Sequence, residues 1–103
     1  MQVTDTVMAQ MHATPEQFVA AREYAQFSTR GLAEEVSREL RKDRRKPPMA
    51  CSRSTISNLE TGVARRIHHR RAAAIERVLK LPPGHLFRVE VFNVHSNKER
   101  LTA

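Results

Sequence analysis

Four side chains between positions 53 and 58 have the types and the spacing needed to read base edges. At about 100° per residue, they share one side of a short helix: Arg53, Ser54, Ser57 and Asn58. An arginine can pair with guanine O6 and N7, and an asparagine with adenine N6 and N7. Solvated helix faces usually carry Glu, Lys, Gln or Ala, because Ser, Thr and Asn lower helix propensity. The polar face therefore favours base recognition over an ordinary surface helix.

The same stretch carries signals for both ends of this helix. Ser52 can cap the first free N–H groups, and Gly62 can take the left-handed conformation that ends a helix. Ile56, Leu59 and Val63 share the opposite side and should face the core. About eight residues at 1.5 Å each give roughly 12 Å of helix, which is close to the width of a DNA major groove.

Positive charge is concentrated around this predicted helix. The chain has 103 residues and a net charge of +7. Residues 38–80 hold 13 basic and four acidic side chains, whereas residues 1–37 hold two basic and five acidic ones. A solubilising surface would mix the two signs, so this concentration indicates a nucleic-acid partner. Charge alone carries no sequence information and does not separate specific from general binding.

Length and composition exclude several classes. No apolar run approaches a membrane span and no signal-peptide pattern begins the chain, so we expect a cytoplasmic protein. The single cysteine, Cys51, cannot form an internal disulfide, which agrees with a reducing compartment. His68 and His69 are adjacent and lack the spacing of metal ligands on a helix. With no catalytic triad or glycine-rich phosphate loop to place, we expect no enzyme, no metal and no cofactor.

The first half of the chain predicts two more helices. Thr14, Pro15 and Gln17 form a capping-box pattern for a helix that ends near residue 26. The buried side of this helix should hold Phe18, Ala21 and Ala25, with Val19 and Tyr24 as further candidates. Ser28 can cap a second helix, which the prolines at 47 and 48 should end by residue 45. The second helix should bury Leu32, Ala33, Val36 and Leu40.

The two ends of the chain leave alternatives open. Residues 1–13 could form a short helix or a strand. Residues 88–94 alternate like a strand, which would need the N-terminal segment or a second subunit as its partner. Between these ends, a fourth helix should be interrupted by the Pro-Pro-Gly at 82–84, after which Leu86 and Phe87 should close the core.

Two motifs resemble the helix-turn-helix of the phage repressor and Cro family, also called the XRE family. They read FSTRGLAEEV over residues 27–36 and SRSTISNLETG over residues 52–62. The resemblance covers roughly residues 15–88. It implies an all-α, five-helix domain, with residues 1–14 as an arm or short helix and residues 89–103 as a strand or tail. About a dozen residues stand where the family has a short turn, so either the second helix is extended or the turn is an insertion.

Carried over to this chain, the resemblance implies base contacts by the polar face at 53–58. It implies phosphate contacts by Ser28, Thr29, Arg65 and Arg66. Six further residues are candidates for phosphate contacts. Five belong to the basic run before the predicted reading helix, and the sixth is the last residue of that helix: Arg41, Lys42, Arg44, Arg45, Lys46 and Thr61. Glu60 lies close to the apolar stripe, so we interpret it as a structural polar residue.

These features predict a sequence-specific regulator that binds double-stranded DNA, as a phage immunity repressor or a Cro-like protein would. A homodimer through Val89, Val91 and Phe92 would suit a twofold operator, and a monomer is also compatible with the sequence. The alternative from another class is the antitoxin of a toxin–antitoxin pair. A third interpretation is a chromosome-coating protein with equal affinity for every sequence.

Overall fold

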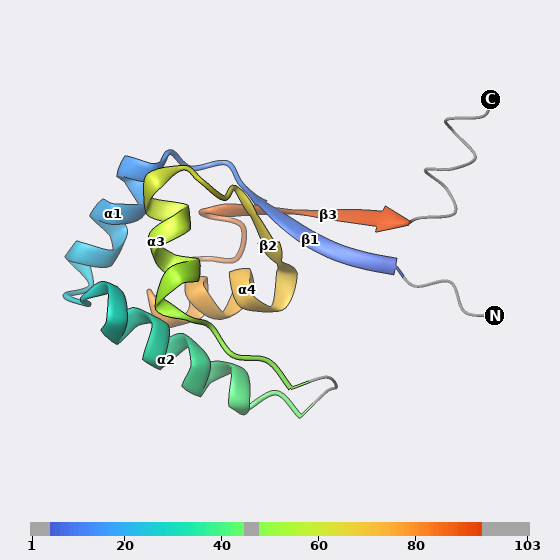
Figure 1. The fold of residues 1–103 in the computed structure, drawn as a ribbon, viewed down its shortest axis with the longest axis horizontal. Helices are drawn as coiled ribbons and strands as arrows, with labels where there is room; N and C mark the ends of the chain where they lie inside the picture. The colour runs from blue at the N-terminus through green and yellow to red at the C-terminus, as the bar shows by residue number, and fades with distance from the viewer. Residues whose placement is uncertain (1–4, 45–47, 94–103) are drawn as a thin grey trace.

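The computed structural model describes residues 5–44 and 48–93, which form four helices and a three-stranded antiparallel sheet (Figure 1). In chain order, the elements are β1 (Asp5–Met11), α1 (Pro15–Tyr24), α2 (Thr29–Arg41), α3 (Arg53–Thr61), β2 (Arg66–His68), α4 (His69–Val78) and β3 (Phe87–Asn93). The predicted all-α fold with five helices is therefore wrong.

A turn replaces the expected fifth helix. Residues 82–83 are prolines, which remove two backbone donors, and Gly84 has a φ of 86°. The carboxylate of Glu76, buried in α4, accepts hydrogen bonds from the N–H groups of Gly84, Leu86 and Phe87 at 2.8–3.1 Å. One side chain thus satisfies three backbone donors of the turn. Leu86 and Phe87 are both buried, as expected.

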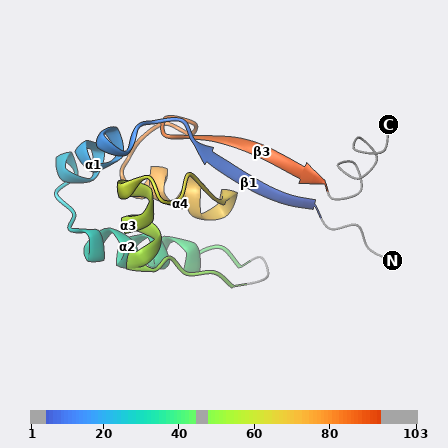
Figure 2. The ribbon, with the colours of Figure 1, turned by 45° about the horizontal axis from the view of Figure 1, so that its top comes forward.

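The sheet joins the two ends of the described chain. Its strand order is β2-β1-β3, and β3 pairs with β1 from Asp5 opposite Asn93 to Met11 opposite Phe87. Residues 5–11 of the N-terminal segment therefore form a strand, which is the partner that the C-terminal strand needed, whereas residues 1–4 lie outside the described residues. β2 was not predicted, and it pairs only with residues 8–10 of β1. Figures 1 and 2 both show the β1–β3 ribbon extending away from the helices.

The core lies where one face of the sheet meets the helices. Ala9 and Met11 of β1 are fully buried together with Phe18 of α1. The rings of Phe18 and Phe87 meet edge to face, with 6.5 Å between their centroids. The four α2 residues predicted to be buried are all in the core: Leu32, Ala33, Val36 and Leu40.

Two predictions of burial are wrong. Tyr24 is 92% exposed, because it lies about 100° around α1 from Ala25, which packs against the core. Val63 is 76% exposed, because Gly62 has a φ of 80° and turns the chain away from the helix. A residue after this turn no longer follows the apolar stripe of α3.

The predicted helix starts are confirmed. Thr14, Ser28 and Ser52 each accept a hydrogen bond from the backbone N–H three residues later. Gln17 completes the capping box by accepting from the N–H of Thr14 at 2.8 Å. The longest helix in the described residues is α2 with 13 residues, and none there is long and apolar enough to cross a membrane.

Candidate nucleic-acid interface

α3 has one buried face and one exposed face. Ile56 and Leu59 are fully buried, as predicted. The opposite side exposes Arg53, Ser54 and Asn58, with Ser57 half-buried beside them. Within the described residues, none of these four side chains has a hydrogen-bond or ion-pair partner. The structure thus brings the four predicted base-reading side chains together on one open face.

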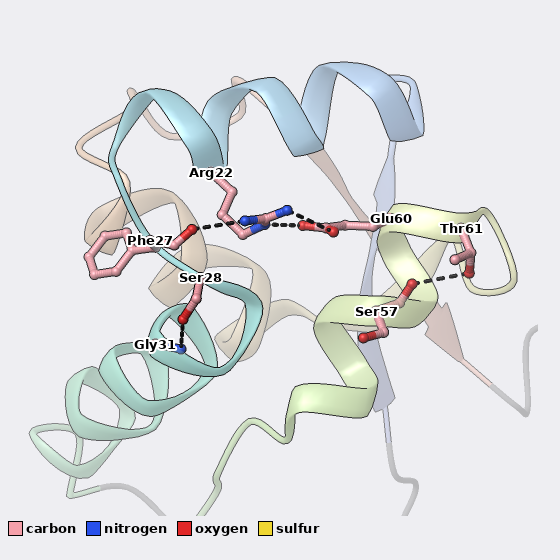
Figure 3. A network of polar contacts seen from close by, with 7 residues as sticks. All are labelled: Arg22, Phe27, Ser28, Gly31, Ser57, Glu60 and Thr61. Atoms are coloured by element: carbon pink, nitrogen blue, oxygen red, sulfur yellow. Dashed lines mark hydrogen bonds and ion pairs between the residues drawn. The ribbon is translucent and has the colours of Figure 1, made fainter.

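An ion pair fastens the last turn of α3 to α1. The guanidinium of Arg22 donates two N–H groups to the carboxylate of Glu60 and a third to the carbonyl of Phe27 at 2.8 Å (Figure 3). The side chains of Arg22 and Glu60 are only 14% and 13% exposed. The hydrogen bond with Glu60 raises the pKa of Arg22 above its usual value, so the guanidinium stays charged. Glu60 has the structural role that was predicted for it.

Thr61 uses its hydroxyl within the helix. Its O–H donates to the carbonyl of Ser57 at 3.0 Å (Figure 3). A hydroxyl has one hydrogen, so Thr61 in this arrangement can accept from a ligand but cannot donate to a phosphate. The geometry therefore disfavours the predicted phosphate contact by Thr61.

The start of α2 offers donors beside α3. Ser28 accepts from the N–H of Gly31 at 2.9 Å, which leaves the hydroxyl hydrogen of Ser28 available (Figure 3). Ser28 is exposed and Thr29 is half-buried. The first turn of α2 contains no acidic residue, so the positive end of the helix dipole is not neutralised there. This end of α2 suits the phosphate contacts predicted for Ser28 and Thr29.

The loop between α2 and α3 covers residues 42–52, since α2 ends at Arg41 and is not extended. Ser37 of α2 fastens the end of this loop by accepting from the N–H of Cys51 and donating to its carbonyl, both at 2.9 Å. Burial raises the pKa of Cys51 to about 11, so its thiol is neutral at physiological pH. These contacts hold the residue that directly precedes the cap of α3.

α4 fastens the same loop from the other side. Arg70 is 7% exposed and pairs with Asp43 at 3.2 Å. Arg71 donates to the carbonyl of Ala50 at 2.7 Å. The sequence did not predict a structural role for these two arginines, because their partners lie more than 20 residues away. The described part of the loop is therefore held by contacts with both α2 and α4.

The predicted phosphate-binding cations have different surroundings. Arg41 and Arg44 are exposed and have no ion-pair partner among the described residues, whereas Lys42 pairs with Glu39 at 3.3 Å. Arg65 and Arg66 are exposed beside β1, where they donate to the carbonyl of Met11 and the side chain of Gln10. The remaining two candidates, Arg45 and Lys46, lie outside the described residues.

His68 caps α4 and its ring stacks on that of His69. The ring centroids lie 4.8 Å apart, and Nδ1 of His68 accepts from the N–H of Arg70 at 3.2 Å. Burial and the neighbouring cationic side chains lower the pKa of His68, which keeps its ring neutral as a cap requires. In the described part of the chain, no group of three or more His, Cys, Asp or Glu side chains could hold a metal ion.

Sequence reasoning missed Arg30 and Arg38 of α2, which lie on the same side of the helix as the predicted phosphate contact Arg41. They surround a hollow of about 290 Å³ beside the start of α3, which we call the α2–α3 hollow. Its lining residues are Arg30, Ala33, Glu34, Ser37, Arg38, Arg41, Cys51 and Arg53. The signal that could have found it is the spacing of Arg30, Arg38 and Arg41, because offsets of eight and 11 residues return to one side of a helix.

Comparisons with known proteins find no matching family model, no matching curated protein and no matching solved structure. The resemblance to the phage repressor and Cro family therefore stays a prediction from two local motifs.

Proposed function

We propose that this protein is a cytoplasmic, sequence-specific DNA-binding regulator that represses transcription by occupying a promoter. The observation that carries the proposal is the open polar face of α3, which has an amide, two hydroxyls and a guanidinium without internal partners in the described residues. Water hydrates such open groups in the free protein, and they add no stability to the fold. Base edges in a major groove would replace that water as hydrogen-bond partners.

The roles of the side chains follow from their chemistry. Arg53 pairs with a guanine, Asn58 pairs with an adenine, and Ser54 and Ser57 accept or donate as the bases require. Ser28 and Thr29 hold the backbone on the side of α2. Arg65 and Arg66, together with the basic loop before α3, contact further phosphates. If about six phosphates are neutralised, log K falls with log salt at a slope near −5.

We also propose that β3 joins two copies of the chain, through the strand that contains Val89, Val91 and Phe92. β3 is an edge strand, and Val89 is 60% exposed. The backbone N–H of Met11 points toward β2, where it donates to the carbonyl of Arg65. Successive residues of a strand direct their backbone groups to alternate sides, and in this register the backbone groups of Val89 and Val91 point away from β1. A second β3 can pair with this edge and place two α3 helices on a palindrome.

Selection of bound sequences from a random duplex pool tests the proposal. We expect a defined motif, and we expect Asn58→Ala to lose discrimination at one position of it. Glu23→Ala is the control, since Glu23 is exposed at the end of α1 and should leave the motif unchanged. A palindromic motif would support the dimer. Salt-sensitive binding without any motif would contradict the regulator and indicate a chromosome-coating protein.

A further inference from the structure

The α2–α3 hollow combines cations from two elements around one space. Arg30 and Arg41 come from opposite ends of α2, and Arg53 is the first residue of α3. All three side chains are exposed and have no hydrogen-bond or ion-pair partner within the described residues. Arg38 also lines the hollow, but it pairs with Glu35. The lining therefore holds three guanidinium groups that are paired with no carboxylate among the described residues.

Three of the residues that line the hollow carry no charge. They are Ala33, Ser37 and Cys51, whose thiol is neutral because burial raises its pKa to about 11. Ser37 is occupied by its two hydrogen bonds with Cys51. The first turn of α3 opens beside the hollow and contains no acidic residue. Of the described residues that line the hollow, four are arginines and one, Glu34, is a carboxylate, so positive charge exceeds negative charge there.

We propose that the α2–α3 hollow binds a phosphate group of the DNA backbone beside the base pairs that α3 reads. The inference rests on the proposed function and adds Arg30 to its phosphate contacts. A guanidinium presents planar pairs of N–H groups that match two oxygens of a phosphate. Because Arg53 belongs both to the open face of α3 and to the hollow, a phosphate held there is directly adjacent to the reading face.

A backbone contact predicts a particular pattern of losses. Arg30→Gln and Arg41→Gln should each weaken duplex binding about tenfold, as expected for hydrogen bonds to a charged group. Each should reduce the salt slope by about 0.9 and leave the selected motif unchanged. Arg77→Gln is the matched control, because Arg77 is also an exposed helical arginine but pairs with Glu39 on another side of α2. It should change neither affinity nor slope.

A change of opposite sign makes the test sharper. Among the described residues, Glu34 is the only carboxylate that lines the hollow, so Glu34→Gln should raise duplex affinity several-fold at low salt. Glu23→Gln removes an exposed carboxylate from α1, away from the hollow, and should leave affinity unchanged. All variants keep helix-forming side chains, and circular dichroism would verify that they fold.

The outcomes separate this inference from the proposed function. A wild-type motif together with unchanged affinity and slope in Arg30→Gln and Arg41→Gln would overturn the hollow as a phosphate site. Absence of any motif, with both variants still weakened, would overturn the regulator and support the phosphate contact. Titration with inorganic phosphate at constant ionic strength separates backbone from free anion. We expect no saturation below the millimolar range, and tight binding that competes with DNA would overturn the backbone assignment.

Discussion

The two ends of α3 use arginine in different ways. At the C-terminal end, Arg22 is largely buried and its charge is neutralised by Glu60. At the N-terminal end, Arg53 is exposed beside Arg30 and Arg41, and none of these three has a partner among the described residues. Breaking a buried pair leaves an uncompensated charge, whereas removing an exposed cation costs the fold little. The difference separates arginines that hold α3 in place from arginines that are available to a ligand.

Removing Glu60 should have the largest effect. Glu60→Ala leaves the guanidinium of Arg22 largely buried without its anion, and we expect the free energy of unfolding to fall by about 3 kcal/mol. Urea unfolding followed by circular dichroism would measure the loss. Glu35→Ala is the matched control, since it breaks the exposed pair with Arg38 and should cost less than about 1 kcal/mol. Equal losses of stability in the two variants would contradict the view that the buried pair contributes more than the exposed one.

Removing Arg53 should produce the opposite pattern. Arg53→Ala should change the free energy of unfolding by less than about 0.5 kcal/mol, because the side chain is exposed. Its affinity for the selected duplex should fall about 10- to 100-fold through the lost guanine contact. Fluorescence anisotropy would measure binding, with Arg77→Ala as the control. A loss of stability as large as that of Glu60→Ala would show that Arg53 has a structural role after all.

Substitutions of two glycines test whether the position of the C-terminal end of α3 affects duplex binding. Gly62 and Gly84 have φ values of 80° and 86°, so an alanine at either position should cost about 1–2 kcal/mol. Gly62 ends α3, whereas Gly84 lies in the turn before β3. We expect similar losses in urea unfolding but weaker duplex binding only for Gly62→Ala. Equal effects of both variants on binding would mean that the position of the end of α3 is unimportant.

The smallest effect should be a pH dependence at the start of α4. Burial and nearby cations lower the folded pKa of His68, so the unfolded chain binds a proton more readily than the folded chain. Neutral His68 contributes its full stability at a pH above the unfolded pKa of about 6.5. This stability should be lost as the pH falls from the unfolded pKa to the lower folded pKa. His68→Asn keeps a capping side chain without titrating, and its Tm should fall less between pH 7.5 and 5.5. Equal decreases would contradict this assignment.

The helices could be predicted because their signals are local. Thr14, Ser28 and Ser52 each bond to a backbone group three residues away, so a short stretch of sequence specifies the start. The open face of α3 and the burial of Ile56 and Leu59 follow from helical periodicity in the same way. These signals need no knowledge of the rest of the chain.

The errors arise where the partner is distant or the backbone changes direction. The carboxylate of Glu76 accepts hydrogen bonds from the backbone N–H groups of the turn that replaces the fifth helix, and no local sequence pattern predicts this role. Val63 follows the apolar period but lies beyond the left-handed Gly62. β2 has only three residues, too few for alternation to be visible.

Local sequence is enough to specify the helix ends, the two faces of α3 and the concentration of positive charge. Long-range contacts in the folded chain settle which arginines keep that charge available. The charges of Arg22 and Arg70 are neutralised by Glu60 and Asp43, which lie 38 and 27 residues away in the sequence. The charge of Arg53 has no such partner among the described residues. The folded chain also settles that residues 5–11 form a strand, because their pairing with β3 joins residues from opposite ends of the chain. Composition and periodicity describe a residue and its near neighbours, and long-range partners exist only once the chain has folded.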